Sequence, residues 1–540
     1  MNMFGSANDM HNMNMKHSRY KTAFKGAATA AKGATAGLLA FTIILLTGCA
    51  TNPVTGKREI SFTSEAQELA IGAKNYGAYQ QAQGGDLVTY PRVTAYVQDV
   101  GSKLAAVSDR KLPYEFVVLN DSVPNAWALP GGKIAINRGL LIELNSEAEL
   151  AAVLGHEIVH AAAKHTAKQM DRGILAQTAM AGLQIGLGDS EYANLGMMAG
   201  QMGGALMLSK YGRGAELESD EYGIKYMSKA GYDPNAAVDL QKTFVRLSKG
   251  KNPGWLGGLF ASHPPSQERV QKNQEHATKY PPGKTGVEEY KNAMGPLRAA
   301  KDAYDTYDEG LKALVKKDPA TALRLARQAI SLEPKEPHFY ALASKAEAVQ
   351  KNYAAAEKQI DRALVLNSHY FDYHLMKAQL AEKRGNRSEA RTSYEKSLTL
   401  LPTPKAHHAL GMMALNSGSQ AVAMRHFSAA ASSNTPEGEA SRVMLAKTDL
   451  PKNPGKYIET RLALGRDGYL RVQVINRSAV KVSFISIQLN ISGQIKNIYV
   501  RDTLRPGQTY TTNTRFGPYG SSEEIQGRAA TRVIAAKVVE

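Results

Sequence analysis

The feature that most constrains the chain is the pattern H-E-x-x-H at residues 156–160. Apolar residues precede it, and Ser146 and Glu149 have the spacing of a capping box, so we expect a helix that begins near residue 146. On a helix, His156 and His160 are one turn apart and face the same side. Two neutral imidazoles at this spacing can hold one Zn²⁺, and Glu157 can reach a water molecule beside the ion as general base. The alternative interpretation is a pair of surface histidines on an amphipathic helix.

A catalytic zinc site needs a third protein ligand. A histidine six residues after the second one would serve, but Thr166 occupies that position. His165 is one residue away, and on a continuous helix it would point away from His160, so we interpret it as a helix C-terminal or surface histidine. Glu216 and Asp220 are at i and i+4 on a second expected helix and therefore share one face. Glu216 can ligate zinc, while Asp220 can accept a hydrogen bond from a ligand imidazole and so fix its tautomer.

Several short motifs accompany the H-E-x-x-H helix, at residues 125–132, 138–141, 216–220, 230–234, 262–265 and 269. In their order and spacing, the chain resembles the zinc metallopeptidases of the BepA, HtpX and Ste24 type, which are gluzincins. Among these it is most similar to the periplasmic lipoprotein form with tetratricopeptide repeats. The resemblance implies a zinc endopeptidase in which His156, His160 and Glu216 hold one Zn²⁺ per chain and Glu157 is the general base. Ser219 stands where the family usually has alanine, which is also small.

A short strand is expected directly after the turn at residues 130–132. Its residues alternate in polarity: Lys133, Ile134, Ala135, Ile136 and Asn137. In the resembling enzymes this strand lies beside the zinc helix. We therefore expect an edge strand to which an extended substrate adds through backbone hydrogen bonds. A simple hairpin strand is the alternative.

Two further features of the expected peptidase domain keep two interpretations each. His263 precedes two prolines in a loop, and it could approach the zinc or an oxyanion. The resemblance implies a regulatory histidine here, and an ordinary loop histidine is the alternative. The stretch 173–208 is rich in Ala, Gly and Met, and its two apolar runs are too short to span a membrane. It forms either a helical hairpin that covers the active site or touches the membrane, or buried core.

Residues 1–48 have the pattern of an export signal: a basic stretch, then an apolar core of eleven residues at 36–46. Such a core is too short to span a bilayer. Cys49 follows, and as the only cysteine in the chain it cannot form an intramolecular disulfide. The pattern resembles a bacterial lipoprotein signal, which implies lipidation of Cys49 and anchoring to a membrane that faces the periplasm. Ala50 then favours the outer membrane. An uncleaved signal with an incidental cysteine is the alternative.

Residues 303–450 carry a 34-residue repeat. Small residues recur at this spacing in three units: Ala322, Ala356 and Ala390. A weaker fourth unit has Met424 and Ala431 in the same register. This is the tetratricopeptide period, in which small residues lie where paired helices cross. Stacked helix pairs form an α-solenoid whose concave groove binds peptides or partner proteins. Together with the resemblance, this implies envelope proteins as partners of the repeats.

Beyond a break at residues 452–455, apolar residues alternate in several short runs, which predicts a small β-sandwich. The chain is therefore expected to be multidomain and mainly α. Its expected parts are a lipoprotein signal peptide 1–48, a tether 49–63, a zincin-like α+β metallopeptidase domain 64–275, a linker 276–302, the tetratricopeptide α-solenoid 303–450 and a C-terminal β-sandwich 456–540.

The formal net charge of +17 would suit nucleic acid, acidic proteins or an anionic membrane surface. No nucleic-acid-binding module is recognisable, so we expect no nucleic acid as partner. The resemblance implies a zinc-dependent endopeptidase of the bacterial cell envelope that degrades misfolded or stalled envelope proteins, notably those of the outer membrane. The alternative is a chaperone or assembly factor that acts through its repeats and has a latent protease.

Overall fold

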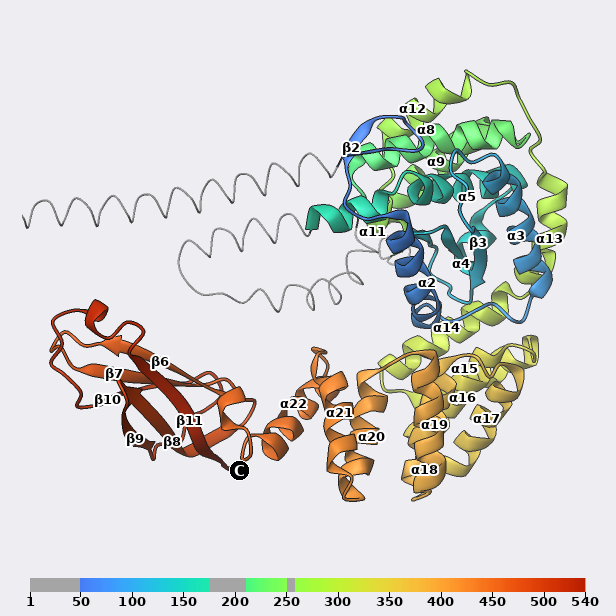
Figure 1. Ribbon diagram of the computed structural model, residues 1–540. Coiled ribbons are helices and arrows are strands. Elements are labelled where there is room, and N and C mark those ends of the chain that lie inside the picture. Colours follow the sequence, from blue (N-terminus) through green and yellow to red (C-terminus); the bar gives the residue numbers. More distant parts are fainter. Residues whose placement is uncertain (1–48, 174–209, 250–257, 540) are drawn as a thin grey trace, which may run out of the picture. The chain divides into compact units, whose positions relative to one another are not determined.

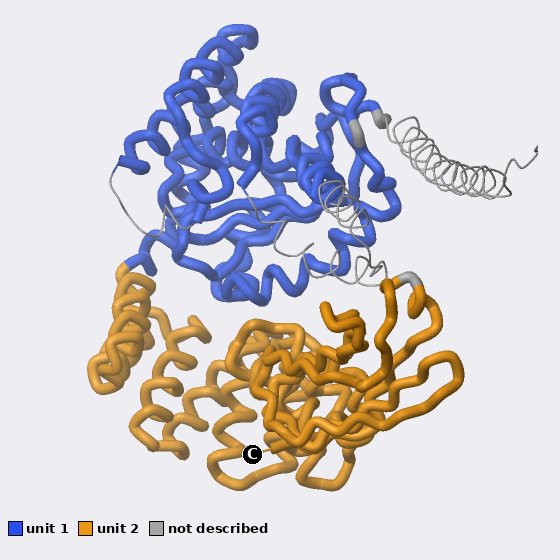
Figure 2. The backbone as a smooth tube through the Cα atoms, turned by 90° about the vertical axis from the view of Figure 1, so that its left-hand side faces the viewer, with its two compact units in different colours: residues 1–301 blue, residues 302–540 orange. Residues whose placement is uncertain are grey.

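The computed structural model describes residues 49–173, 210–249 and 258–539 (Figure 1). The chain divides into two compact units, residues 1–301 and 302–540 (Figure 2). Most of it is helical. The expected signal peptide and nearly all of the Ala-, Gly- and Met-rich stretch lie outside the described residues. Within the described part, no helix has both the length and the apolar character needed to cross a membrane.

Helix α5 (Glu147–Ala162) carries the H-E-x-x-H pattern and is buried along its whole length. Ser146 caps it, because Ser146 Oγ accepts a hydrogen bond from the Glu149 backbone N–H at 3.0 Å. Only half of the expected capping box forms, since Glu149 Oε2 accepts from the Asn145 backbone N–H at 2.7 Å instead. The motif therefore lies on a helix enclosed by other elements, and not on an amphipathic surface helix.

The helices around α5 come from both sides of it in the sequence (Figure 1). They are α2 (Glu65–Ala82), α3 (Pro91–Ala106), α4 (Arg138–Glu143), α8 (Arg213–Lys229), α9 (Asn235–Ser248), α11 (Leu259–Ser262), α12 (Gln267–Ala277) and α13 (Val287–Ala299). Helices α3, α8 and α9 pack directly on α5, and α12 packs on α8 and α9. Glu216 and Asp220 are on α8, so this packing brings both carboxylates to the H-E-x-x-H helix.

Helices α5 and α8 approach each other closely at two glycines. A Cβ atom added to Gly223 of α8 would lie 3.1 Å from the backbone nitrogen of His156, and one added to Gly155 would lie 3.2 Å from the Gly223 carbonyl oxygen. Side chains at these positions would push the helices apart. The crossing therefore sets how near the carboxylates of α8 come to the histidines of α5.

A three-stranded sheet beside α5 has the strand order β3-β5-β4. Strand β5 (Lys133–Asn137) pairs in parallel with β3 (Glu115–Leu119) and antiparallel with β4 (Ala126–Leu129). The prediction that Lys133, Ile134, Ala135, Ile136 and Asn137 form an edge strand is therefore wrong, because both sides of β5 are paired. Residues 126–129, expected only as part of a motif before the turn, form a strand and occupy the edge. Helix α5 contacts both β4 and β5.

The N-terminal segment of the described chain is a two-stranded sheet. Strand β1 (Cys49–Thr51) pairs antiparallel with β2 (Arg58–Ile60), with Cys49 opposite Ile60. Asp171 then holds the following residues, since its Oδ1 accepts from Thr63 Oγ1 at 2.7 Å and its Oδ2 accepts from the Phe62 backbone N–H at 2.9 Å. The segment expected as a tether is thus folded onto the rest of the first unit.

The second unit begins with nine helices in antiparallel succession. They are α14 (Lys301–Val315), α15 (Pro319–Leu332), α16 (Pro337–Val349), α17 (Tyr353–Leu366), α18 (Phe371–Lys383), α19 (Arg387–Leu400), α20 (Pro404–Asn416), α21 (Gln420–Ala431) and α22 (Pro436–Asp449). Consecutive helices from α15 to α22 pack on one another. This is the stacking expected of tetratricopeptide repeats.

The repeated small residues lie in the helix contacts, as the period predicts. Ala322, Ala356 and Ala390 are all fully buried. In the fourth unit the predicted register is wrong, because the buried residues are Ala423 and Ala430 and not Met424 and Ala431. Helix α19 begins at residue 387 and α21 at residue 420, one residue short of the 34-residue period.

Two three-stranded antiparallel sheets follow the helices. Their strands are β6 (Ile458–Leu464), β7 (Leu470–Asn476), β8 (Lys481–Ile491), β9 (Gln494–Val500), β10 (Thr509–Asn513) and β11 (Ala529–Val539). The strand orders are β10-β7-β6 and β11-β8-β9. Both sheets contribute to one hydrophobic core, which also contains Ala446 of α22 and Leu450 directly after that helix.

Candidate metal centre

Four buried side chains that could bind a metal ion lie close together: His156 and His160 of α5, Glu216 of α8 and His263 after α11. One ligand atom of each lies within 4.8 Å of the others. His156 Nε2 lies 3.0 Å from His160 Nε2 and 3.3 Å from His263 Nδ1. Glu216 Oε1 lies 3.0 Å from His263 Nδ1 and 3.4 Å from His160 Nε2. A tetrahedral zinc ion with bonds of about 2.0–2.1 Å separates its ligand atoms by about 3.4 Å. Four of the six separations are therefore close to those around one such ion, and all six stay within 4.8 Å.

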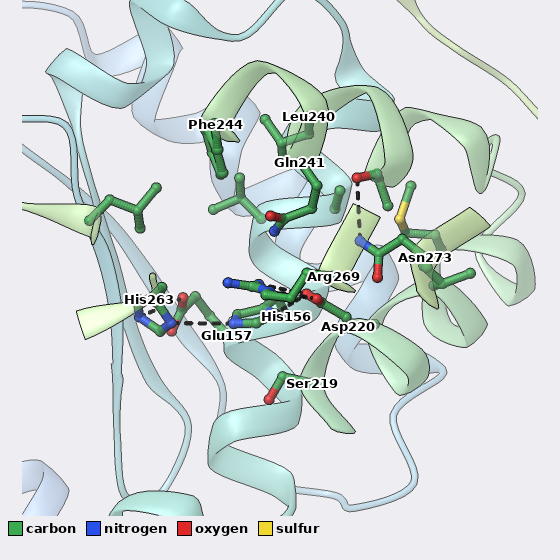
Figure 3. Close-up of a pocket in the computed structure, with 17 residues that line it drawn as sticks. His156, Glu157, Ser219, Asp220, Leu240, Gln241, Phe244, His263, Arg269 and Asn273 are labelled. Atoms are coloured by element: carbon green, nitrogen blue, oxygen red, sulfur yellow. Dashed lines mark hydrogen bonds and ion pairs between the residues drawn. The ribbon is translucent and has the colours of Figure 1, made fainter. Parts of the chain in front are cut away.

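Glu157 lies on the same helix and is 1% exposed. Its Oε2 and the Nε2 of His263 are buried without a hydrogen-bond partner among the described residues. Its other oxygen, Oε1, lies 3.5 Å from that His263 nitrogen (Figure 3). Burial raises the pKa of Glu157, although the positive charge of the nearby histidines opposes the shift. Buried polar atoms without partners are rare, and they mark a place that can take a further polar group.

Asp220 and Arg269 lie beside His156 (Figure 3). Asp220 Oδ1 lies 2.9 Å from His156 Nδ1, so His156 can donate there and direct its Nε2 lone pair into the cluster. Arg269 donates to both oxygens of Asp220 at 2.7 Å, and its Nη1 lies 2.7 Å from Glu216 Oε2. Burial alone would raise the pKa of Asp220 and Glu216, but the charges around them, including that of Arg269, outweigh burial and lower both values. Both carboxylates therefore stay ionised.

His165 does not lie where the sequence suggested. Helix α5 ends at Ala162, Lys164 adopts a left-handed backbone conformation with φ 61°, and a further helix begins at His165. This break returns His165 to the cluster, where its Nδ1 lies 2.9 Å from His160 Nδ1. The interpretation as a helix C-terminal or surface histidine is wrong, because His165 begins a new helix and is buried. A non-glycine residue with positive φ is not visible in the sequence.

Tyr211, just before α8, is a further residue of the site that sequence reasoning missed. Its ring stacks on His160, with 3.8 Å between the ring centres, and its hydroxyl lies 2.9 Å from Thr166 Oγ1. A cleft of ≈ 520 Å³ opens beside Glu216 and is lined by Tyr211, Arg213 and Arg269 among others. The sequence shows Thr166 only as the residue in the place of a third histidine. In the structure it is the hydrogen-bond partner of the Tyr211 hydroxyl.

The family of the chain follows from comparison with known proteins. Residues 91–277, which contain all four members of the cluster, match the family described as Peptidase family M48. The chain carries an M48 peptidase domain. Residues 307–370 match a tetratricopeptide repeat family. The resemblance inferred from the motifs is thereby confirmed, and the M48 domain is that of a metallopeptidase.

Several curated proteins are similar to a part of this chain. A putative beta-barrel assembly-enhancing protease of Vibrio cholerae serotype O1 is 33% identical over 36% of this chain and 41% of its own length. The mitochondrial metalloendopeptidase OMA1 of Schizosaccharomyces pombe is 31% identical over 41% of this chain and 65% of its own length. The beta-barrel assembly-enhancing protease of Escherichia coli K12 is 27% identical over 43% of this chain and 48% of its own length. The chain thus matches about half the length of these relatives.

Proposed function

We propose that the chain is a zinc-dependent endopeptidase of the bacterial cell envelope. The observation that carries this proposal is the convergence of four buried ligand atoms beside a buried Glu157 oxygen that has no hydrogen-bond partner among the described residues. His156, His160 and Glu216 would hold the ion. Asp220 would fix the orientation of His156, and Arg269 that of Glu216. A bound zinc ion would supply Lewis-acid activation of a water molecule and of the peptide carbonyl.

The residues of the chain divide the remaining chemistry among them. Glu157 accepts a proton from the attacking water molecule and later donates it to the leaving amine of the cleaved peptide bond. Its position one residue after His156 on a rigid, enclosed helix keeps the carboxylate next to the ligand atoms. The surrounding apolar residues, including Val153 and Leu259, line a cavity of ≈ 40 Å³ at His156 and limit the access of water.

His263 has a regulatory role in this proposal. Its Nδ1 lies among the ligand atoms, and a fourth protein ligand would occupy the position that a catalytic zinc site keeps open. The loop that carries His263 must then move before the site can take a substrate. Binding at an oxyanion is the alternative role, and its unpartnered Nε2 could donate there.

A substrate is proposed to add to the sheet as an extended strand. Because β5 is paired on both sides, the edge strand beside α5 is β4 (Ala126–Leu129). Its four residues are buried, so the residues that cover this edge must be displaced for a substrate to pair. Strand addition reads the backbone more than the side chains, which suits a protease of unfolded chains. Misfolded or stalled envelope proteins are the proposed substrates. The similarity to beta-barrel assembly-enhancing proteases supports outer-membrane proteins among them.

The location and the domain plan complete the proposal. Cys49 would carry a lipid anchor that holds the protein at a membrane facing the periplasm, with the outer membrane favoured. The M48 domain would have the zincin-like arrangement at residues 64–275, and residues 456–540 would form a β-sandwich, which the shared core of the two sheets supports. The repeats at 303–450 would recruit envelope proteins. An assembly factor that acts through these repeats, with a latent protease, is the second candidate, favoured by the tetratricopeptide match.

The deciding experiment is degradation of casein by the wild type and by Glu157→Gln, with the zinc content of both measured. We expect one zinc per chain in both proteins and cleavage only by the wild type. Glu221→Gln changes an exposed carboxylate on α8 and is the control, which should cleave normally. Cleavage by Glu157→Gln at the wild-type rate would contradict the proposed chemistry, while an inactive wild type that still assists assembly would favour the second candidate.

A further inference from the structure

Both ring nitrogens of His160 have a nitrogen neighbour. Its Nε2 faces the cluster, while its Nδ1 lies 2.9 Å from Nδ1 of His165. Nε2 of His165 lies 3.2 Å from Oε1 of Glu218 on α8. The same oxygen accepts a hydrogen bond from Asn52 Nδ2 at 2.9 Å. Side chains from three separate segments thus form a continuous chain from the N-terminal sheet to the metal-ligand cluster.

The direction of each hydrogen bond follows from the carboxylate end of this chain. An ionised carboxylate only accepts, so His165 must carry its hydrogen on Nε2. A neutral imidazole has one N–H, and its Nδ1 is then an acceptor, to which His160 must donate from its own Nδ1. The lone pair of His160 is therefore on Nε2, the atom that faces the cluster. Ser219 Oγ is a second neighbour of His165 Nδ1, but at the longer distance of 3.4 Å.

The orientation of the Asn52 amide is also fixed. Asn52 is 2% exposed, and its Oδ1 accepts hydrogen bonds from the backbone N–H groups of Val54 at 2.9 Å and Thr55 at 3.3 Å. With the oxygen committed to this turn, Nδ2 is the atom directed at Glu218. The segment is held further by an ion pair between Lys168 and Glu59. The sheet at residues 49–60 therefore has a fixed position next to the chain of hydrogen bonds.

We propose that His165, Glu218 and Asn52 are positioning residues that hold His160 in the tautomer and orientation of a metal ligand. A ligand histidine commonly donates its other N–H to a carboxylate, as His156 can to Asp220, and loss of that partner weakens metal binding. At His160 a second histidine stands between the ligand and the carboxylate. Through Asn52, the segment directly after Cys49 becomes part of the support of the metal centre. This inference rests on the proposed zinc site.

The first test is zinc affinity, measured by chelator competition on the full chain, together with the visible absorption of the Co²⁺-substituted protein. For His165→Leu we expect an affinity lower by about 10- to 100-fold and a changed Co²⁺ spectrum, because His160 loses its acceptor. His165→Gln should restore both readouts, since an amide can accept from His160 and donate to Glu218. The control is His276→Leu, because His276 also lies near a carboxylate of α8, that of Glu221, but is remote from the cluster.

The second test changes a residue outside the helices that carry the cluster. Asn52→Asp keeps an oxygen for the turn but replaces the donor to Glu218 with a second oxygen, so we expect weaker zinc binding without loss of the fold. If both His165→Leu and Asn52→Asp bind zinc as tightly as the wild type, with unchanged Co²⁺ spectra, the positioning role is refuted while the zinc site stands. If His165→Leu does not fold, Asn52→Asp decides the question. Failure of the wild type to bind zinc would overturn the proposed function and this inference together.

Discussion

Gly155 of α5 and Gly223 of α8 are in backbone contact, so that a Cβ atom on Gly223 would lie 3.1 Å from the His156 backbone nitrogen. The contact is between backbone atoms of two helices, so no side-chain rotation can relieve it. The contact determines the separation between the H-E-x-x-H helix and the helix that carries Glu216. The metal centre therefore depends on two residues that have no chemistry of their own.

Gly223→Ala should weaken zinc binding more than it weakens the fold. The added methyl group forces α8 away from α5 by a few tenths of an ångström, which moves Glu216 relative to the histidines, whereas alanine favours helix over glycine by about 0.5–1 kcal/mol. Gly214→Ala is the matched control on α8, because nothing lies within 4 Å of its Cβ position. Zinc affinity and thermal unfolding of both variants check this. Equal zinc affinity in the two would show that the crossing does not control the site.

Replacing any of the three proposed ligands, His156, His160 or Glu216, by alanine should remove zinc and peptidase activity together. Each change removes one ligand atom from a site whose four members are all buried. Glu221→Ala, on the same helix as Glu216 but pointing to an exposed position, should keep both. Metal analysis of the purified variants is the measurement. Stoichiometric zinc in Glu216→Ala would mean that His263 replaces it as the third ligand.

The zinc-free protein should lose stability in acid. The folded-state pKa values of Glu216 and Asp220 are lowered, so their contribution is present above the unfolded values of about 4 and is lost as the pH falls towards the folded ones. Arg269→Gln removes one cause of the lowering. It should be less stable at pH 6, by about 3–5 kcal/mol, and its stability should depend less on pH below 5. Urea unfolding between pH 3 and 6 would show an equal acid loss in both proteins if Arg269 were unimportant.

The sequence predicted the centre of the site better than its surroundings. Helical spacing alone placed His156 and His160 on one face and Glu216 and Asp220 on another. Glu157 lies in the same turn as the two histidines. The role of His165 depends on the positive φ of Lys164, and spacing along a helix cannot show where the helix breaks. The central position of β5 depends on pairing with β4, whose four residues carry no alternation. Tertiary pairing decides such short strands.

Cys49→Ser should release the protein from the membrane if Cys49 is the lipid attachment site. Cell fractionation and a shift in mass of the mature protein are the measurements. Ala50→Ser, a polar change in the same strand that keeps the cysteine, is the control and should stay with the membrane. Retention of Cys49→Ser in high salt would show that another segment, such as residues 173–208, holds the protein there.

Cleavage and recruitment should be separable at the boundary of the two units. A chain that ends at residue 301 keeps the whole first unit, so we expect it to bind zinc and degrade casein. It should no longer co-purify with envelope proteins, because each repeat buries its apolar face only against its neighbours and none remains. Pull-down and casein assays of the truncated protein with and without Glu157→Gln test this. Partners that persist without residues 302–540 would refute recruitment by the repeats.

Helix α22 ends the helical array, yet Ala446 and Leu450 lie in the core of the following sheets. Solenoids need a terminal cap whose outer face tolerates water. Here the outer face of the last helix is apolar and is sealed by strands, so the strands take the part of the cap. A gene fusion or shortened chain that stops near residue 450 would therefore expose the apolar surface of the last helix to water. Aggregation of such a product would reflect the loss of the covering strands and not a defect in the repeats themselves.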